Sequence, residues 1–389
     1  MPTRTDLVIV GAGLAGAAAA YAAATRGLNV VVLDAFGPAH RNGSSHGSAR
    51  IFRRAYPDPL YVRLTGQAGQ RWRELAAEAG QDLLTLTGGL DFGTVRNPSQ
   101  LHAVLTSCGV PAELLTEAAA AERWPQFDFH GVKQVMFHAE AGVLDPDRAV
   151  AALLRLATAR GADVRFDTPV TRLAATATGA VAHTDSGDFA APVIAVAAGA
   201  WIAPLLDGLL KLPPLTVTQQ QVFHFAPGAS GASGTQPPQP ATEPWPTFID
   251  YDEAGYMYGL PGGRDGEVPG AIKVAEHDPG LVTTADSRDF RVDPPARDRV
   301  RGYVAKRLPA LDPTPVNETT CLYTWTANED FILDRPAGGP FVVASPCSGH
   351  GAKFAPLLGE LIADLATGAP AADPRFTLAA HLAAHPAAR

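Results

Sequence analysis

One stretch early in the chain, residues 43–53, has the residue types and the spacing that anion binding requires. It reads GSSHGSARIFR, so small residues alternate with His46, Arg50 and Arg53. Glycine and serine suit a loop that lies against a cofactor, while guanidinium groups can face bound anions. A solvated basic loop neutralised by Asp58 is the competing interpretation, and the spacing alone does not choose between the two.

A second stretch, residues 348–354, reads SGHGAKF and lies between a predicted strand and a predicted helix. The free N–H groups at the start of a helix supply positive potential, so such a loop can stabilise an anion. A serine hydrolase pair of Ser348 and His350 is a poor interpretation because the Gly-x-Ser-x-Gly motif is absent. The eleven histidines show no paired ligand spacing such as His-Glu-x-x-His, so we expect no metal site.

A nucleotide-binding motif opens the chain. Residues 11–16 read GAGLAG, and Asp34 ends the next predicted strand, at the distance expected for an acid that binds ribose hydroxyls. The first glycine permits the tight turn, the second lets a pyrophosphate approach backbone N–H groups, and the third lets helix and strand pack closely. NAD and FAD fit this motif equally well. The predicted cofactor-binding glycines are Gly11, Gly13 and Gly16.

The elements that must position these residues predict a Rossmann-type α/β fold with a second, mainly antiparallel-sheet domain. Apolar strands at 6–10, 29–33, 163–166, 193–197 and 341–344, with helices at 14–26, 146–160 and 357–366, indicate one parallel sheet. Alternating patterns at 221–225 and 256–260 are typical of antiparallel strands. We expect a nucleotide-binding domain over 1–87, 139–214 and 321–389, and a substrate domain over 88–138 and 215–320. The composition of residues 227–246 predicts an exposed loop. The tail after Pro370 is expected to be a surface segment with one short helix.

Composition excludes several classes of protein. The chain has 389 residues and a net charge of −8, without a cluster of Lys and Arg, so we expect it to bind neither nucleic acid nor anionic membranes. Residues 7–25 are almost wholly apolar, but their glycine cluster argues against a membrane span or a signal peptide. Three widely spaced cysteines fit no disulfide scaffold, and we expect a cytoplasmic protein.

Taken in order, the motifs resemble those of monomeric sarcosine oxidase and N-methyltryptophan oxidase, within the family of FAD-dependent amine and amino-acid oxidases. The likeness covers nearly the whole chain. It rests on residues 43–53, 348–354 and 321–324 (CLYT), with weaker matches at 123–125, 142–144, 198–201, 258–261 and 330–334. The resemblance implies a monomer that binds FAD and acts on a small amino acid with O2.

The resemblance also implies a covalent bond between the flavin and Cys321. Without the family match, a lone cysteine beside Leu322 would be taken as a small buried hydrophobe. Cys108 and Cys347 match no family position and are expected to be core residues. The cofactor-binding residues that the resemblance implies are Gly11, Gly13, Gly16, Asp34, Ser44, Ser45, Arg50, Val170, Cys321, Gly349, His350, Gly351 and Lys353.

The catalytic residues are likewise implied by the resemblance. Lys273 matches the lysine that assists oxygen reduction, although an edge-strand lysine that discourages aggregation is the simpler interpretation. Arg53 and Lys353 match the pair that binds the substrate carboxylate. Arg50 and His46 match residues near the flavin ring, and His277 matches a histidine at the substrate end.

The implied reaction is FAD-dependent oxidation of a secondary amine in an amino acid to an imine, with O2 reduced to hydrogen peroxide. Ala49 and Ala352 stand where sarcosine oxidases tend to carry larger residues, and Trp325 stands where no large aromatic is usual. These differences put sarcosine itself in question and equally favour a larger N-substituted or cyclic secondary amino acid. The alternatives are a noncovalent FAD amino-acid dehydrogenase, an NAD(P)-dependent dehydrogenase and a non-catalytic flavin-binding protein.

Overall fold

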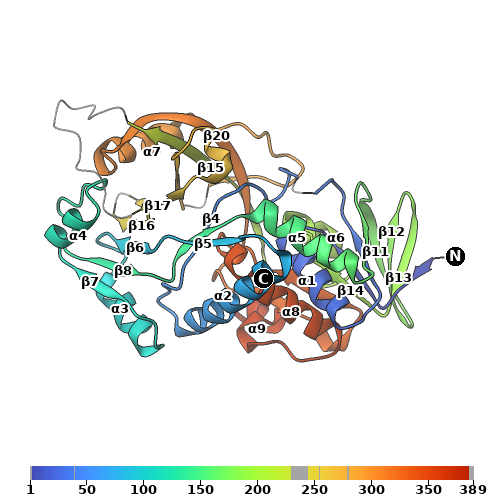
Figure 1. Cartoon of the computed structure of the whole chain (residues 1–389). Coiled ribbons are helices and arrows are strands. Elements are labelled where there is room, and N and C mark those ends of the chain that lie inside the picture. Colours follow the sequence, from blue (N-terminus) through green and yellow to red (C-terminus); the bar gives the residue numbers. More distant parts are fainter. Residues whose placement is uncertain (1, 39, 229–243, 254, 278–279, 385–389) are drawn as a thin grey trace.

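The computed structural model describes residues 2–38, 40–228, 244–253, 255–277 and 280–384, and it confirms the Rossmann-type α/β fold (Figure 1). A six-stranded sheet gathers strands from the beginning, middle and end of the chain, as the apolar segments predict. All its neighbouring strands run parallel except the last pair. Its order is β10 (Asp163–Arg165), β3 (Val30–Leu33), β2 (Leu7–Val10), β14 (Val193–Val196), β22 (Phe341–Ser345) and β21 (Ile332–Asp334).

Three helices, α1 (Leu14–Thr25), α5 (Pro146–Ala159) and α8 (Ala355–Ala366), pack on this sheet. Helix α1 consists largely of alanine, which keeps its surface flat and lets neighbouring helices approach. A Cβ on Gly359 of α8 would lie 2.3 Å from the backbone of Ala18, so the two helices touch through backbone atoms. Helix α5 begins after Asp145, whose carboxylate accepts a hydrogen bond from the first turn.

The second large sheet is mainly antiparallel and has an aromatic core on one face. Helices α3 (Pro98–Ser107), α4 (Glu117–Arg123) and α7 (Pro294–Arg307) contact its strands. Its order is β19 (Leu281–Val282), β15 (Thr216–Pro227), β18 (Ile272–Glu276), β17 (Gly255–Pro261), β16 (Thr247–Asp252), β6 (Gly89–Phe92), β8 (Val135–His138) and β7 (Glu113–Leu115), and β20 (Leu311–Trp325) pairs with β15.

Two smaller sheets complete the fold. One has the order β1 (Thr3–Arg4), β13 (Gly187–Ala191), β12 (Gly179–Thr184) and β11 (Val170–Thr176). The other has the order β4 (Arg50–Phe52), β9 (Gly142–Leu144) and β5 (Leu84–Leu86), and it lies between the two large sheets in the view of Figure 1. The remaining α-helices of the described chain are α2 (Pro59–Ala79), α6 (Ile202–Leu206) and α9 (Leu378–Ala384).

The domain limits stay a prediction. The limit expected at residue 321 falls inside β20, which pairs with β15 from Leu311 to Trp325. Strand β20 thereby carries Cys321 from the large antiparallel sheet to the side of the parallel sheet. Residues 229–243 of the expected exposed loop lie outside the described residues.

The tail after Pro370 is better packed than its composition predicts. The expected short helix is α9, but Phe376 before it is completely buried, and Leu378 and His381 are also buried. The ring of His381 bonds the backbone oxygen of Phe331 at 2.9 Å. These contacts join the tail to the core because an aromatic ring and a polar anchor offset the entropy of ordering the segment.

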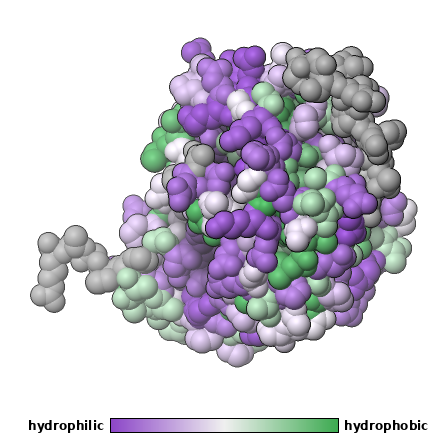
Figure 2. Space-filling view, turned by 90° about the vertical axis from the view of Figure 1, so that its left-hand side faces the viewer, coloured by the Kyte–Doolittle hydropathy of each residue, from purple (hydrophilic) through white to green (hydrophobic). Residues whose placement is uncertain are grey.

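The face of the molecule in Figure 2 is mostly hydrophilic, with hydrophobic side chains in small scattered groups. Among the described residues, no helix combines the length and apolar character that crossing a membrane requires.

Candidate active site

A cavity of about 650 Å³ opens where the glycine motif meets β20, and we call it the cofactor cavity. Ten of the predicted cofactor-binding residues line it: two glycines of the first motif and eight others. Its lining includes Gly11, Gly13, Asp34, Ser44, Ser45, Arg50, Val170, Cys321, Gly349 and Gly351.

The glycine motif leaves room for a cofactor because side chains would fill that room. Gly11 has a φ of +99°, and a Cβ there would lie 2.6 Å from the backbone oxygen of Ala197. A Cβ on Gly13 would lie 2.9 Å from Ser45 Oγ, inside the cavity lining. Gly16 does not line the cavity; a Cβ there would lie 1.8 Å from Gly11 O, so its role is helix packing. The cradle fits a dinucleotide in the manner that the motif predicts.

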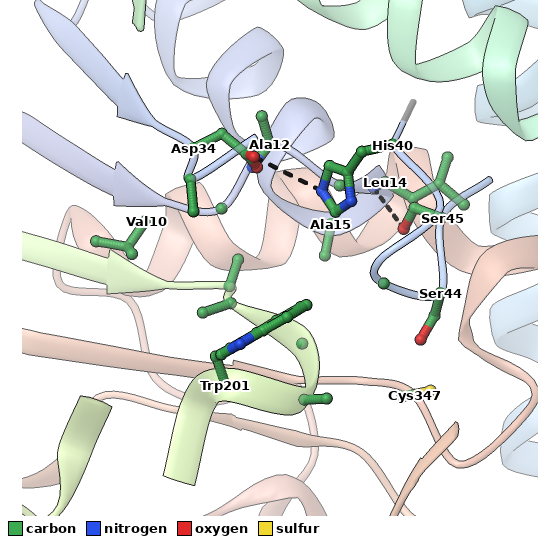
Figure 3. A pocket seen from close by; sticks show the side chains of 18 of the residues that line it. Val10, Ala12, Leu14, Ala15, Asp34, His40, Ser44, Ser45, Trp201 and Cys347 are labelled. Atoms are coloured by element: carbon green, nitrogen blue, oxygen red, sulfur yellow. Dashed lines mark hydrogen bonds and ion pairs between the residues drawn. The ribbon is translucent and has the colours of Figure 1, made fainter. Parts of the chain in front are cut away.

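Asp34 holds the glycine loop from the end of β3. Its Oδ2 accepts a hydrogen bond from Ala12 N at 2.6 Å, and its Oδ1 accepts one from Phe36 N at 2.9 Å. Figure 3 shows Asp34, His40 and Ser45 around the cavity, with the ring of Trp201 extending into it from another segment. A flat ring and a carboxylate at this end provide the apolar surface and the acceptor that a nucleoside requires.

Cys321 lies at the other end of the cofactor cavity, 4% exposed. Arg50 Nη2 lies 3.5 Å from its sulfur. Burial raises the pKa of the thiol, but Arg50, His46 and Lys273 outweigh it and lower the pKa to about 6. Cys321 is therefore largely thiolate at neutral pH, the form that acts as a nucleophile. His46 is buried beside it and lines neither cavity.

A second cavity, of about 430 Å³, adjoins the first, and we call it the substrate cavity. Four residues line both cavities, and they mark the place where the two meet. The shared residues are Arg50, Tyr323, Gly349 and Ala352. The predicted site residues in the substrate cavity are Arg50, Arg53, Lys273, His277, Gly349, His350 and Lys353. His350 and Lys353 thus lie in the substrate cavity, although they were also expected to bind the cofactor.

Arg53 and Lys353 are two basic side chains of the substrate cavity. Arg53 donates to the backbone oxygen of Ala55, and its guanidinium lies 4.5 Å from the ring centre of Tyr56. Lys353 Nζ donates to His350 O at 2.8 Å, and Trp72 Nε1 donates to Lys353 O at 2.8 Å. Burial and then repulsion from Arg53 lower the pKa of Lys353 well below its usual value. An incoming carboxylate would relieve this repulsion, which makes the pair a carboxylate site.

Lys273 is buried on β18 at the inner end of the substrate cavity. Its Nζ donates to Ala49 O at 3.0 Å, which leaves further N–H bonds available to a ligand. Burial and then repulsion from Arg50 lower its pKa to about 7, against attraction from Cys321 and Asp265. Its side chain faces a cavity, not the solvent of a sheet edge, because β18 lies between β15 and β17.

Most of the aromatic rings in this cavity were not among the predicted site residues. One group joins Tyr256, His277 and Tyr323, with ring centres 4.6 and 5.7 Å apart. Another joins Tyr56 and Tyr61, stacked at 5.3 Å. Tyr256 and Tyr258 both line the cavity from β17. Their spacing of two residues places them on one face of a strand, and this spacing could have identified them from the sequence. Tyr61 comes from α2 and Tyr323 from β20, while Tyr56 and His277 lie in loops, so no single periodicity in the sequence brings these rings together.

The two histidines of the substrate cavity are neutral. Burial, followed by repulsion from Arg53 and Lys353, lowers the pKa of His277 to about 3. Burial and then Lys353 lower that of His350 to about 3. His350 Nδ1 lies 3.1 Å from Tyr56 Oη, so this ring is held in place by a polar contact. Within the described ranges, no group of acidic, histidine or cysteine side chains could hold a metal ion.

A Rossmann-type nucleotide cradle that leads to a cationic cavity defines a dinucleotide-dependent oxidoreductase. The model of the FAD dependent oxidoreductase family matches residues 6–365, and the chain belongs to this family. It is 34% identical to monomeric sarcosine oxidase of Streptomyces avermitilis, over 96% of each chain. It is 32% identical to N-methyl-L-tryptophan oxidase of Yersinia pestis, over 94% of this chain and 95% of that one.

Solved structures agree with this assignment. NikD, described as an unusual amino acid oxidase essential for nikkomycin biosynthesis, has a TM-score of 0.82 and 26% identity, over 96% of each chain. L-proline dehydrogenase from P. horikoshii has a TM-score of 0.81 at 22% identity, over 97% of this chain and 98% of that one. The second likeness concerns the fold. The expected family is confirmed, and the chain is an FAD-dependent oxidoreductase.

Proposed function

We propose that this protein oxidises a secondary amine in an amino acid to an imine and reduces O2 to hydrogen peroxide. The observation that carries the proposal is the pair of buried cations, Arg53 and Lys353, in a cavity that adjoins the cofactor cavity. The names of the relatives, a sarcosine oxidase and an N-methyltryptophan oxidase, support a substrate that has both a carboxylate and a secondary amine.

Arg53 and Lys353 bind the substrate carboxylate and thereby orient the amine toward the shared boundary at Gly349. Bound FAD would accept a hydride equivalent from the substrate carbon and return the electrons to O2. Fixed orientation removes much of the entropic cost of bringing the two reactants together. Gly349 is required at this boundary because a Cβ there would lie 2.7 Å from both His277 and Tyr323.

The free amine is the reactive form of the substrate, and the cavity selects it by charge. Arg53 and Lys353 repel a protonated amine, whereas a neutral amine carries no such penalty. His277 and His350 stay neutral and contribute no charge. We assign no side chain as a general base.

Lys273 provides the positive charge for oxygen reduction. A cation held by Ala49 O stabilises the negative charge that O2 acquires as electrons reach it, without reorganisation of solvent. Different basic side chains of one cavity thus have different roles. Arg53 and Lys353 bind the substrate carboxylate, and Lys273 serves the reduction of O2.

Cys321 would hold the flavin covalently, through a thioether to its 8α carbon. Support comes from its position in the cofactor cavity and from its lowered pKa. An Sγ–C bond replaces the thiol S–H and one methyl C–H bond, and O2 takes up two electrons and two protons to give hydrogen peroxide. A noncovalent FAD enzyme, the alternative, would leave this thiolate without a function.

The substrate is an N-substituted or cyclic amino acid larger than sarcosine. A cavity of about 430 Å³ with two groups of aromatic rings offers far more apolar surface than a methyl group covers. Ala352, which lines both cavities, leaves space at their boundary. A planar or cyclic side chain would fill this space and stack on the rings.

The experiment that tests the function is an anaerobic screen of linear and cyclic secondary amino acids, with flavin absorbance as the readout. We expect at least one bulky secondary amino acid to bleach the flavin faster than sarcosine does. A yellow protein that no amine bleaches would favour a non-catalytic flavin protein. A colourless protein that reduces NAD(P) would favour the nicotinamide alternative, and flavin released on acid precipitation would favour noncovalent binding.

We also propose that the protein works as a monomer in the cytoplasm. The three cysteines are all free, which suits a reducing compartment. Sedimentation at equilibrium would test the monomer, and a mass of twice 40.6 kDa would contradict it.

A further inference from the structure

A buried arginine outside both cavities joins the two segments that the covalent bond must bring together. Arg288 lies in the segment 283–290, between β19 and α7, and is only 6% exposed. It lines neither the cofactor cavity nor the substrate cavity. Arg288 therefore has no direct contact with either cavity that would give it a catalytic role, and its burial needs another explanation.

The guanidinium of Arg288 donates in two directions. Nη1 donates to Arg41 O at 2.8 Å and to Asn42 O at 3.4 Å. Nη2 donates to Thr320 O at 2.6 Å and to Thr320 Oγ1 at 2.7 Å. One planar group thus links residues 41–42 to β20, two segments that are far apart in the sequence. A planar group with donors in fixed directions sets the separation of the backbones it binds.

Both linked segments lead directly to the cofactor cavity. Residues 41–42 precede Ser44 and Ser45. The Oγ of Ser45 accepts a hydrogen bond at 3.0 Å from the backbone N of Leu14, the first residue of α1 and part of the glycine motif. Thr320 precedes Cys321 on β20. Ser44 Oγ donates to Leu322 O at 2.6 Å and closes the same junction from the cavity side. We call residues 41–45 the cofactor loop. Its distance from Cys321 is set by contacts to both sequence neighbours of the cysteine, through Arg288 to Thr320 and through Ser44 to Leu322.

Arg288 is held in place at a cost in solvation. Burial lowers its pKa, and attraction from Cys321 and Asp289 opposes this only in part. Its guanidinium lies 4.2 Å from the ring centre of Phe290, which has a positive φ of 60°. A buried cation whose main partners are backbone carbonyls is retained for the geometry that those partners acquire.

We propose that Arg288 is a positioning residue for covalent attachment of the flavin. It holds the cofactor loop 41–45 against β20 so that the Cys321 thiolate meets the flavin methyl group. In that step, an Sγ–C bond replaces one methyl C–H bond; O2 takes the two electrons, together with the methyl proton and the proton that the thiol released on ionisation. The inference rests on the proposed thioether at Cys321 and extends it to a residue that touches neither partner.

The test uses flavin-free protein prepared from riboflavin-limited cells. FAD is added in air, and intact mass follows the gain of covalent flavin with time. Arg288→Met removes all four hydrogen bonds of the guanidinium, and we expect it to slow attachment about tenfold or more, because even one strong charged hydrogen bond has an effect of that size. The exposed Arg291→Met, three residues further along, should attach FAD at the wild-type rate and serves as the matched control.

Two further variants separate positioning from general stability. Arg288→Lys keeps the charge but not the planar fork, so we expect an attachment rate between those of Arg288→Met and wild type. Thr320→Val removes only the hydroxyl contact, preserves a β-branched residue in the strand and should slow attachment a few-fold. This milder variant keeps the test decisive if Arg288→Met does not fold.

The outcomes distinguish the two proposals. If the wild-type protein gains no mass, the thioether at Cys321 is refuted and the role of Arg288 with it. If the wild type gains the mass and both Arg288→Met and Thr320→Val gain it equally fast, only the role of Arg288 is overturned. A lower Tm with an unchanged attachment rate at 25 °C would likewise make Arg288 merely structural.

Discussion

The cofactor cavity and the substrate cavity meet at Arg50 and Gly349, yet their walls differ in kind. The cofactor cavity is lined mainly by small and apolar residues, with glycine and alanine prominent among them. The substrate cavity is lined by arginine, lysine, histidine and tyrosine side chains, and by Asp58, Glu329 and Asp330; they come from loops, from α2 and from the antiparallel sheet. The strongest pKa shifts among these groups also lie in the substrate cavity.

This difference follows from what each cavity has to bind. A dinucleotide is large and is bound by backbone atoms, which requires the absence of side chains at a few positions. A small amino acid offers few atoms, so side chains must supply the charge and shape that select it. Substitutions should therefore separate into those that alter the cofactor and those that alter the turnover of substrate.

Cys321→Ser should have the largest effect, complete loss of covalent flavin, because a hydroxyl at this position is not ionised. Intact mass of protein from riboflavin-rich cells measures it, with Cys108→Ser as the control. In the wild type, attachment should slow as the pH falls below about 6, because the thiolate is then protonated. Covalent flavin in the Cys321→Ser protein would assign the bond to another residue.

Lys273→Met should slow reoxidation of the flavin by about 10²-fold and leave anaerobic reduction by substrate unchanged. Stopped-flow absorbance separates the two half-reactions. Since the pKa of Lys273 is lowered to about 7, its cation dominates below that pH, and wild-type reoxidation should slow as the pH rises through about 7. The exposed Lys306→Met is the control, and unchanged reoxidation in Lys273→Met would refute the role.

Arg53→Met should lower kcat/KM by about 10²-fold, chiefly through KM, because one of two cations for the carboxylate is lost. Steady-state oxygen consumption measures it. Arg63→Met, an exposed position on α2, should behave as wild type. An equal loss for an amine that lacks a carboxylate would show that Arg53 does not bind this group.

Gly13→Ala should have the smallest effect, roughly tenfold weaker FAD binding, because its Cβ would lie 2.9 Å from Ser45 Oγ. Equilibrium dialysis in the Cys321→Ser background measures affinity without covalent attachment. Gly302→Ala, with open space around its Cβ, is the control. If kcat at saturating FAD fell as far as affinity, the separation of the two cavities would be broken.

The sequence by itself determined the nucleotide half of this protein. Local pattern suffices there, because the glycine motif, the apolar strands and Asp34 act through neighbours within one β-α-β unit. Family motifs also brought out Cys321, Lys273, Arg53 and Lys353 as candidates.

Only the tertiary structure decided which side chains share a cavity and what charge they carry. Tyr56, Tyr256 and Tyr323 come from three separate segments, and Arg288 acts on residues 247 positions away in the chain. The low pKa of Cys321 likewise depends on Arg50 and Lys273, which lie far from it in sequence. Burial and Coulomb interactions depend on distances in space, and these distances exist only once the sheets have packed.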